Sequence, residues 1–215
     1  MITVHHLDNS RSLRVLWLLE ELGLPYDVVE HRRDPVTRLA PPSLEVVHPL
    51  GKAPVIEEDG LVVFESGAIL EYLVRRHGGG QLVPPEDSAD YDRYQMWLHY
   101  SEGSAMLPMM LNLYVARLGE GGTPALRARI DSEMARHLGF LNTSLAGRDF
   151  IVGQKLTAAD IQLSFIGETL AAFGRLAAFP EIKRWLHALQ QRPAYVRAVE
   201  RGSANLFGQK PAVAA

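Results

Sequence analysis

Three residues that can cap a helix stand close together where an apolar segment begins. Asn9, Ser10 and Ser12 lie at the start of the run that ends at Leu22. One capping side chain is enough for a helix start, and it is worth about 1 kcal/mol. The same helix start carries free N–H donors and the positive end of the helix dipole, which favour a bound anion. The surplus hydroxyl groups therefore indicate either plain capping or an anion site.

The composition limits the chemistry that such a site could do. The 215 residues include no cysteine, which excludes disulfides, thiolate metal ligands and an enzyme-borne thiol. If the protein does sulfur chemistry, a small molecule must supply the sulfur. No two of the eight histidines are spaced four residues apart, so we expect no metal site. His5 and His6 are adjacent on a predicted strand and should point to opposite faces of it.

Charge and hydropathy are those of an ordinary globular protein. The net charge of −3 and the lack of any Lys and Arg cluster argue against a nucleic-acid partner. The longest apolar stretch, residues 13–22, is interrupted by Arg14 and Glu20 and is far shorter than the ~20 residues that cross a bilayer. We therefore expect no membrane partner. The first residues show no secretory signal, so the expected location is the cytoplasm.

Strands and helices alternate in the first part of the chain. Two β-prone runs, residues 2–7 and 26–31, flank a helix that is closed by Gly23 and Pro25. This order predicts a βαβ unit with a parallel strand pair and a right-handed crossover.

An irregular segment then leads to a second group of elements. Two apolar runs in residues 54–65 flank Asp59-Gly60, a strong hairpin signal. A helix follows, with Ser66 as its expected cap, and a run of glycines ends it. We predict an α/β, thioredoxin-like domain of the order βαβ-ββα over residues 1–80.

The rest of the chain carries no strand signal. Residues 81–88, rich in proline and acid, form the expected linker, and an all-helical domain should fill residues 89–215. The expected helices are 89–118, 124–146, and three that start at Thr157, near Pro180 and at Pro193. In "LTAAD", residues 156–160, Thr157 as N-cap and Asp160 at the third helical position make a capping box. We assign that motif to folding and not to chemistry.

Four motifs at these intervals make a recognisable set. They are "SRSLRVLWLLEELGLPY", "HPLGKAPVIE", "ESGAILEYL" and "LTAADIQLSF". Together they resemble the cytosolic glutathione S-transferases, in particular the bacterial and fungal branches that use serine rather than tyrosine. The resemblance covers nearly the whole chain and implies glutathione as co-substrate, with no permanently bound cofactor. It also implies a homodimer with the first helix pair of the second domain at the interface.

The resemblance gives the crowded helix start a catalytic role. A free thiol has a pKa near 8.5, so ionisation at pH 7 needs a drop of roughly two units, or about 2.7 kcal/mol. A hydroxyl donating to the sulfur anion supplies ~1.5–3 kcal/mol and the helix dipole about 0.5–1 kcal/mol. Some serine-type classes place that hydroxyl four residues before the Arg of the "RV" pair, which selects Ser10. Others place it five before, at Asn9, and Ser12 is the third candidate.

The resemblance also implies five residues that bind glutathione. Ala53-Pro54 would be a cis peptide whose Ala53 backbone groups pair with the cysteinyl unit, as an added strand does. Lys52 would hold the glycine carboxylate. Ser66 would receive the γ-glutamyl carboxylate at a helix N-terminus, and Glu65 would pair with the adjacent ammonium group. His48 stands where many relatives carry Asn, which leaves its role open.

The expected reaction is attack by glutathione thiolate on an electrophilic, mostly apolar substrate. The candidate wall of the electrophile pocket is made of methionine and aromatic residues on the first long helix of the second domain, Tyr100, Met106, Met109, Met110 and Tyr114. Methionine and aromatic residues with this spacing more often belong to a core. The alternatives are a glutathione-dependent peroxidase and a non-catalytic protein that binds glutathione or hydrophobic ligands.

Overall fold

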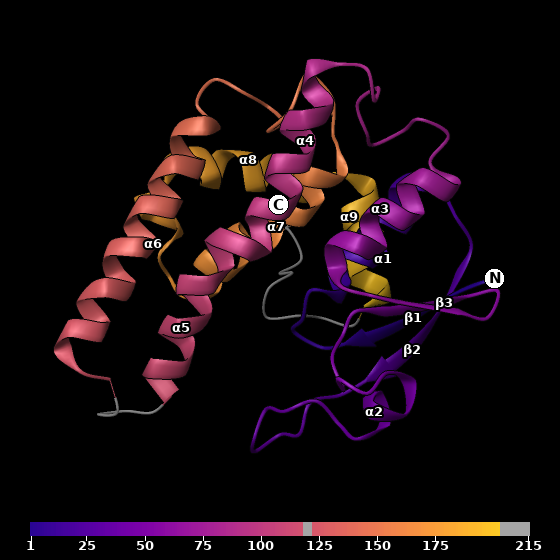
Figure 1. Ribbon diagram of the computed structural model, residues 1–215, viewed down its shortest axis with the longest axis horizontal. Coiled ribbons are helices and arrows are strands. Elements are labelled where there is room, and N and C mark those ends of the chain that lie inside the picture. Colours follow the sequence, from indigo (N-terminus) through magenta and orange to yellow (C-terminus); the bar gives the residue numbers. More distant parts are fainter. Residues whose placement is uncertain (118–121, 203–215) are drawn as a thin grey trace, which may run out of the picture.

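The computed structural model describes residues 1–117 and 122–202, which form a sheet domain and a helical domain side by side (Figure 1). The end of the predicted helix 89–118 and of the predicted domain 89–215 therefore lies outside the described residues. The strands are β1 (Ile2–Leu7), β2 (Tyr26–His31), β3 (Val55–Glu58) and β4 (Leu61–Phe64). The helices of the first domain are α1 (Ser12–Leu22), α2 (Ser43–Val47) and α3 (Ser66–His77). Of these, α2 lies in the segment that the sequence left irregular.

The sheet has the strand order β2-β1-β3-β4. β1 and β2 are parallel, whereas β3 runs antiparallel to β1 and to β4. Asp59 and Gly60, both with positive φ, connect Glu58 directly to Leu61, so the predicted two-residue hairpin is confirmed. This mixed sheet with helices confirms the predicted thioredoxin-like arrangement.

Helix α1 lies at the centre of the molecule. Its residues from Ser12 to Leu19 are all buried, because it packs against β1 and α3 and against α7 and α9 of the helical domain. In Figure 1, α9 lies beside α1, although it is distant from α1 in the sequence. A helix that is buried on all sides has little freedom to shift, so α1 holds its N-terminus firmly.

The second domain is helical, as predicted. Its helices are α4 (Ala89–Tyr100), α5 (Met106–Arg117), α6 (Pro124–Ser144), α7 (Ala158–Ala172), α8 (Pro180–Gln190) and α9 (Pro193–Arg201), with a short 3-10 helix at Leu176–Ala178. The predicted single helix 89–118 is wrong, since a π-helical turn at Ser101–Ala105 separates α4 from α5. Such a turn admits an extra residue into the helix and is common at functional sites.

The helix starts differ in part from the prediction. The capping box at α7 is confirmed, with the Asp160 carboxylate accepting from the Thr157 backbone N–H at 3.0 Å. Ser66 was predicted to cap α3, but it is the first helical residue and its side chain caps nothing. The hydroxyl of Ser66 instead accepts hydrogen bonds from Arg14 and Gln162, which are distant in the sequence. No local sequence pattern predicts such partners.

Candidate functional site

A cavity of about 210 Å³ lies where the loop before β3 meets the start of α3 and the π-helical turn. It brings together all five residues that the resemblance assigned to glutathione, Lys52, Ala53, Pro54, Glu65 and Ser66. The other lining residues are Arg11, His48, Leu50, Phe64 and Glu102. Segments that are far apart in the sequence therefore form one small polar site.

Two unpaired charges of opposite sign line this cavity. Lys52 and Glu65 are both exposed, and neither forms an ion pair with any residue in the described part of the chain. The Ala53-Pro54 peptide is cis, as predicted. Among the described residues, none bonds to the backbone N–H or C=O of Ala53 outside the sheet pairing. The site thus offers a cation, an anion and an open stretch of backbone.

Ser66 is placed to donate a hydrogen bond into the cavity. Its Oγ accepts from Arg14 Nη1 at 3.1 Å and from Gln162 Nε2 at 3.2 Å. A hydroxyl oxygen has two acceptor lone pairs and one proton, so both acceptor positions are occupied. The remaining O–H, together with the free N–H groups at the start of the 12-residue helix α3, favours an anion.

Glu65 precedes α3 in an unusual backbone conformation. Its φ is 68° and its ψ is 118°, a region that non-glycine residues seldom occupy. Strained backbone of this kind is found at functional sites, where the surrounding structure enforces it. The conformation sets the direction in which the Glu65 carboxylate leaves the chain beside Ser66.

Glu102 connects the helical domain to this cavity. Its Oε1 accepts from Arg14 Nη1 at 2.6 Å and from Arg11 Nε at 2.8 Å. Burial opposes the charged form, but Arg14 and Arg11 hold the pKa of the Glu102 carboxyl below its ordinary value. The sequence interpretation missed these three residues and Gln162. Arg14 and Gln162 gave a signal as polar side chains in helices otherwise rich in apolar residues, whereas Arg11 and Glu102 gave none.

His48, whose role the sequence left open, lines the cavity beside an aromatic ring. The His48 ring stacks on Phe64 with 4.2 Å between centroids. His48 Nδ1 also accepts from the backbone N–H of Leu50 at 3.4 Å. His48 thus joins the loop before β3 to the end of β4, on two sides of the site.

The three candidate thiol-contacting residues lie at the edge of the site. Arg11 lines the cavity, but Ser10, Asn9 and Ser12 do not. Ser10 is 7% exposed, and its Oγ accepts from the backbone N–H of Ser12 at 3.2 Å. Ser12 is 0% exposed and its Oγ lies 2.7 Å from that of Ser10. Asn9 has a φ of 51° and donates through Nδ2 to the Asp8 carboxylate at 3.0 Å.

The five residues proposed as an electrophile wall differ in their exposure. Met106 and Met109 are each 1% exposed, so we correct that prediction, because a core side chain offers no surface to a ligand. They share the face of α5 that is turned into the core. Tyr100 donates to the carbonyl of His137 at 3.0 Å, and burial raises its pKa to about 12.

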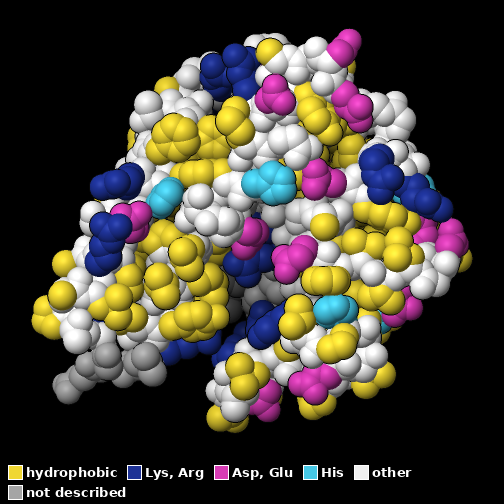
Figure 2. Space-filling model, in the orientation of Figure 1, with side chains coloured by type: hydrophobic (Ala, Val, Ile, Leu, Met, Phe, Trp, Pro, Cys, Tyr) yellow, Lys and Arg dark blue, Asp and Glu magenta, His cyan; other side chains and the backbone are white. Residues whose placement is uncertain are grey.

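The outward face of α5 carries a different apolar set. Leu107, Leu111 and Tyr114 are 57%, 40% and 53% exposed, and Met110 is half-buried. In the space-filling view a hollow separates the lobe of α5 and α6 from the lobe of α2, with Lys and Arg side chains at its floor (Figure 2). Sequence spacing alone could not tell the inward face of α5 from the outward one.

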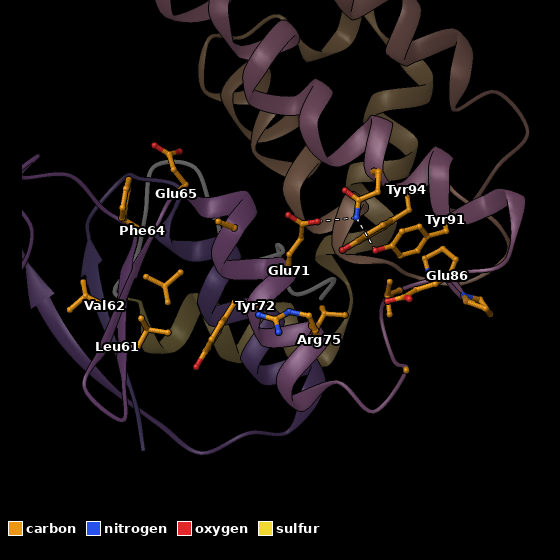
Figure 3. A pocket seen from close by; sticks show the side chains of 18 residues that line it. Leu61, Val62, Phe64, Glu65, Glu71, Tyr72, Arg75, Glu86, Tyr91 and Tyr94 are labelled. Carbon is orange, nitrogen blue, oxygen red and sulfur yellow. Dashed lines mark hydrogen bonds between the residues drawn. The ribbon is translucent and has the colours of Figure 1, made fainter.

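A second, larger cavity of about 1040 Å³ runs along β4, α3 and α4 (Figure 3). Leu61 and Val62 line it and are 50% and 40% exposed. Phe64 and Glu65 line both cavities, so the two are neighbours. Across the groove, Gln95 donates to the Glu71 carboxylate at 2.9 Å.

The described residues form neither a metal centre nor a membrane span. Within residues 1–117 and 122–202, no group of three His, Asp or Glu side chains could hold a metal ion. Over the same residues, no helix is both long and apolar enough to span a bilayer.

Comparison with known proteins extends these findings. Residues 1–75 match the family model for the glutathione S-transferase N-terminal domain, and residues 107–193 match that for the C-terminal domain. Glutathione S-transferase 3 of Schizosaccharomyces pombe is 35% identical, over 95% of this chain and 89% of that protein. Elongation factor 1-gamma 3 of Oryza sativa subsp. japonica is 28% identical over 89% of this chain but only 46% of its own length.

Solved structures agree in fold. A glutathione S-transferase from Actinobacillus pleuropneumoniae is 32% identical with a TM-score of 0.86, covering 97% of this chain and 100% of that one. A sphingomonad glutathione S-transferase complexed with glutathione has a TM-score of 0.77 at 24% identity, over 93% and 98% of the two chains. A thioredoxin-like domain joined to a helical domain, with a charged cavity at their junction, defines the class. The chain belongs to the glutathione S-transferase family.

Proposed function

We propose that this protein is a glutathione transferase that ionises the glutathione thiol and directs it at an apolar electrophile. The observation that carries the proposal is the distribution of charge and backbone in the 210 Å³ cavity. Lys52 and Glu65 supply opposite charges that the described residues leave unpaired. Ala53 offers open backbone between them.

These groups match the chemistry of glutathione, an extended peptide with two carboxylates and one ammonium group. Lys52 binds the glycine carboxylate, and the Ala53 backbone pairs with the cysteinyl unit as an added strand. The Ser66 hydroxyl and the N-terminus of α3 bind the γ-glutamyl carboxylate. Glu65 binds the neighbouring ammonium. Each charged group of the ligand thus meets a complementary group.

We assign the contact with the glutathione thiol to Ser10. Ser10 is the sequence neighbour of Arg11, which lines the cavity, and it directly precedes the start of the buried helix α1. A donated hydrogen bond and the helix N-terminus together provide the roughly 2.7 kcal/mol that ionisation at pH 7 requires. Asn9 stays the second candidate, because its amide can also donate to sulfur.

The electrophile is assigned to the outward face of α5. Tyr114 and Met110, together with Leu111, offer apolar surface there. Activity with glutathione against aryl halides, epoxides, isothiocyanates and hydroperoxides would identify the substrate class, and the last of these also tests peroxidase activity. Cytoplasmic location stays a prediction.

A second copy of the chain is proposed to occupy the groove of Figure 3. Exposed Leu61 and Val62 give the groove an apolar floor, while Glu71 and Arg75 place opposite charges along its wall. A surface with both signs of charge can be self-complementary under two-fold symmetry. The partner would then close the site on the side of Glu65, which lines both cavities.

Calorimetric titration with glutathione tests the binding site. Wild-type protein should bind one glutathione per chain. Lys52→Ala should weaken binding about 10–100-fold, the worth of a hydrogen bond to a charged group. KM for glutathione should rise while kcat stays within a few-fold, because the lost contact is remote from sulfur.

The matched control is Lys155→Ala, which removes another exposed lysine away from the cavity and should bind like wild type. No heat of binding with millimolar glutathione would contradict the proposed function. A fall in kcat with an unchanged KM would show that Lys52 acts elsewhere.

A further inference from the structure

A chain of hydrogen bonds leads inward from Ser10 and ends at Gly202, the last residue that the structure describes. Ser10 Oγ lies 2.7 Å from Ser12 Oγ, which lies 2.9 Å from His6 Nδ1. On the other side of the ring, His6 Nε2 lies 2.6 Å from the carbonyl oxygen of Gly202, just after α9. Ser12 and His6 are 0% and 1% exposed.

The direction of each hydrogen bond in this chain follows from its last member, the Gly202 carbonyl. A carbonyl oxygen only accepts, so His6 Nε2 carries a proton and donates to Gly202. In the neutral ring, Nδ1 is then an acceptor, and it lies 2.9 Å from Ser12 Oγ, closer than the other acceptor in reach, the Leu7 carbonyl at 3.2 Å. We therefore assign the single proton of the Ser12 hydroxyl to the bond with His6. A hydroxyl has a single proton, so Ser12 Oγ accepts from Ser10. All the protons of the chain therefore point inward, from Ser10 to His6.

The same bonds fix the ring in place. The other contacts of Ser12 Oγ are the N–H of Leu7 and the carbonyl of Leu7, both at 3.2 Å. A Cβ atom built on Gly202 would lie 3.0 Å from the His6 ring, so the backbone just after α9 packs closely against the ring. The side chain of His6, on β1, is thus held between the start of α1 and the residue that follows α9.

We propose that His6 is the terminal acceptor of the glutathione thiol proton, which reaches it through Ser10 and Ser12. His6 touches no substrate and is a positioning residue that acts through the two serines. This inference rests on the proposed function, because it requires glutathione with its sulfur at Ser10.

The proton transfer balances without any further reactant. The thiol gives its proton to Ser10 Oγ, Ser10 passes its own proton to Ser12 Oγ, and Ser12 passes its proton to His6 Nδ1. The S–H bond breaks and an N–H bond forms, leaving a thiolate and an imidazolium. The Ser10–Ser12 and Ser12–His6 hydrogen bonds have then reversed, while His6 Nε2 still donates to Gly202, so Ser10 donates to the sulfur anion. The reversal supplies the donor that the thiolate needs.

The surroundings of His6 suit a proton acceptor that is neutral before substrate binds. Burial lowers the pKa of His6, against the opposing effects of the Gly202 carbonyl, Glu30 and Asp8. The ring of His31 on β2 acts in the same direction as burial. The ring becomes charged together with the sulfur, so the new negative charge offsets the cost of charging it.

Proton release on binding is the test. Glutathione is added to the wild-type protein at pH 7 in weak buffer, with a pH indicator for protons and the thiolate absorbance for ionised sulfur. S-Methylglutathione, which has no ionisable thiol, gives the proton release due to all other groups and is subtracted. We expect thiolate to form with close to no net proton release from the thiol.

Two variants test whether the proton is taken up by His6 or by the adjacent His5. His6→Asn removes the base and should release one proton for each thiolate that still forms. His5→Gln is the matched control, because His5 points to the other face of β1, where it bonds to His31 and Glu57, and it should behave like wild type. Nitrogen NMR of the wild-type imidazole should show His6 charged with glutathione and neutral with S-methylglutathione, whether or not the variant folds.

The outcomes distinguish the two proposals. A wild-type protein that releases one proton per thiolate overturns the role of His6 and leaves the transferase assignment standing. A His6 ring that stays neutral while thiolate forms does the same. A protein that binds no glutathione, or forms no thiolate, overturns both.

Discussion

At the scale of single residues, the hydroxyl of Ser10 has two functions that the structure brings together. It accepts the backbone N–H of Ser12 at the start of α1, and it is the outer end of the chain that leads to His6. Ser12, in contrast, is fully buried and bonds to Leu7 and His6. Because the Ser12 hydroxyl is already bonded within the protein, we expect Ser12 to support Ser10 rather than to contact the sulfur itself.

Ser10→Ala should raise the pKa of bound glutathione by roughly one to two units, the share of a hydroxyl that donates to an anion. At neutral pH the thiolate fraction, and with it the rate, should fall about 10–100-fold. Thiolate absorbance of bound glutathione as a function of pH measures the pKa and the thiolate fraction, and a kinetic assay at neutral pH measures the rate.

The controls for this prediction are Asn9→Ala and a denaturant unfolding curve for each variant, since losing the hydrogen bond from the Ser12 N–H to Ser10 costs about 1 kcal/mol of stability. Asn9→Ala should titrate like wild type. If Asn9→Ala raises the thiol pKa and Ser10→Ala does not, the sulfur contact belongs to Asn9.

At the scale of elements, the capping box at the start of α7 also makes contacts outside its own helix. Beyond the capping box, Asp160 accepts from the backbone N–H of Ile151 at 2.8 Å and from the indole of Trp185 at 3.2 Å. Burial raises the pKa of Asp160 to about 6, even though these donors favour the charged form. One carboxylate therefore ties α7 to α8 and to the loop after α6.

Asp160→Ala should lower the free energy of unfolding by about 3 kcal/mol or more, because it leaves several buried donors unsatisfied at about 1–3 kcal/mol each. Urea unfolding measures the loss. Asp131→Ala, which changes an exposed aspartate on α6, should stay within ±0.5 kcal/mol of wild type. Equal stability of Asp160→Ala and wild type would show that the box contributes nothing to the fold.

At the scale of the whole molecule, the dimer proposed above makes the groove along β4, α3 and α4 its interface. Val62→Asp places a charge on its apolar floor and should convert dimers into monomers, as seen by sedimentation equilibrium. Val46→Asp is the matched control, since Val46 is 89% exposed on α2 and lies outside the groove. A wild-type protein that is monomeric at all concentrations contradicts the proposed dimer.

The core of the helical domain contains an acid that should make stability depend on pH. Glu168 on α7 is 2% exposed and accepts from the hydroxyl of Tyr195 at 3.0 Å. Burial raises its pKa to about 7 from an ordinary value of 4.5, more than Tyr195 and Arg14 lower it. The folded protein thus keeps a proton that the unfolded chain loses between these two pH values.

Stability should therefore fall as the pH rises from 4.5 to about 7, by about 3 kcal/mol from this group. Glu168→Gln, which cannot ionise, should lack that part of the slope when urea unfolding is compared across the window. Glu200→Gln changes an exposed glutamate on α9 and should keep the wild-type slope. An unchanged slope in Glu168→Gln would mean that Glu168 does not titrate there.

Local signals explain what the sequence predicted correctly. Asp59-Gly60 accepts positive φ, so the hairpin follows from two adjacent residues. The capping box at Thr157 and Asp160 and the proline starts of α6, α8 and α9 are equally local. The order of elements then restricts the fold to a thioredoxin-like domain followed by helices. The positions that line the cavity could be named in advance only through the family motifs.

Tertiary structure decided what depends on contacts distant in sequence. Ser66 became a donor toward the cavity because Arg14 and Gln162, 52 and 96 residues away, occupy its acceptor positions. Which face of α5 is buried, and hence the correction at Met106 and Met109, depends on the packing of other helices. His6 gained its role from Gly202, 196 residues away. Sequence determines local backbone preference, whereas a hydrogen-bond partner is chosen by the packing that brings distant side chains within reach.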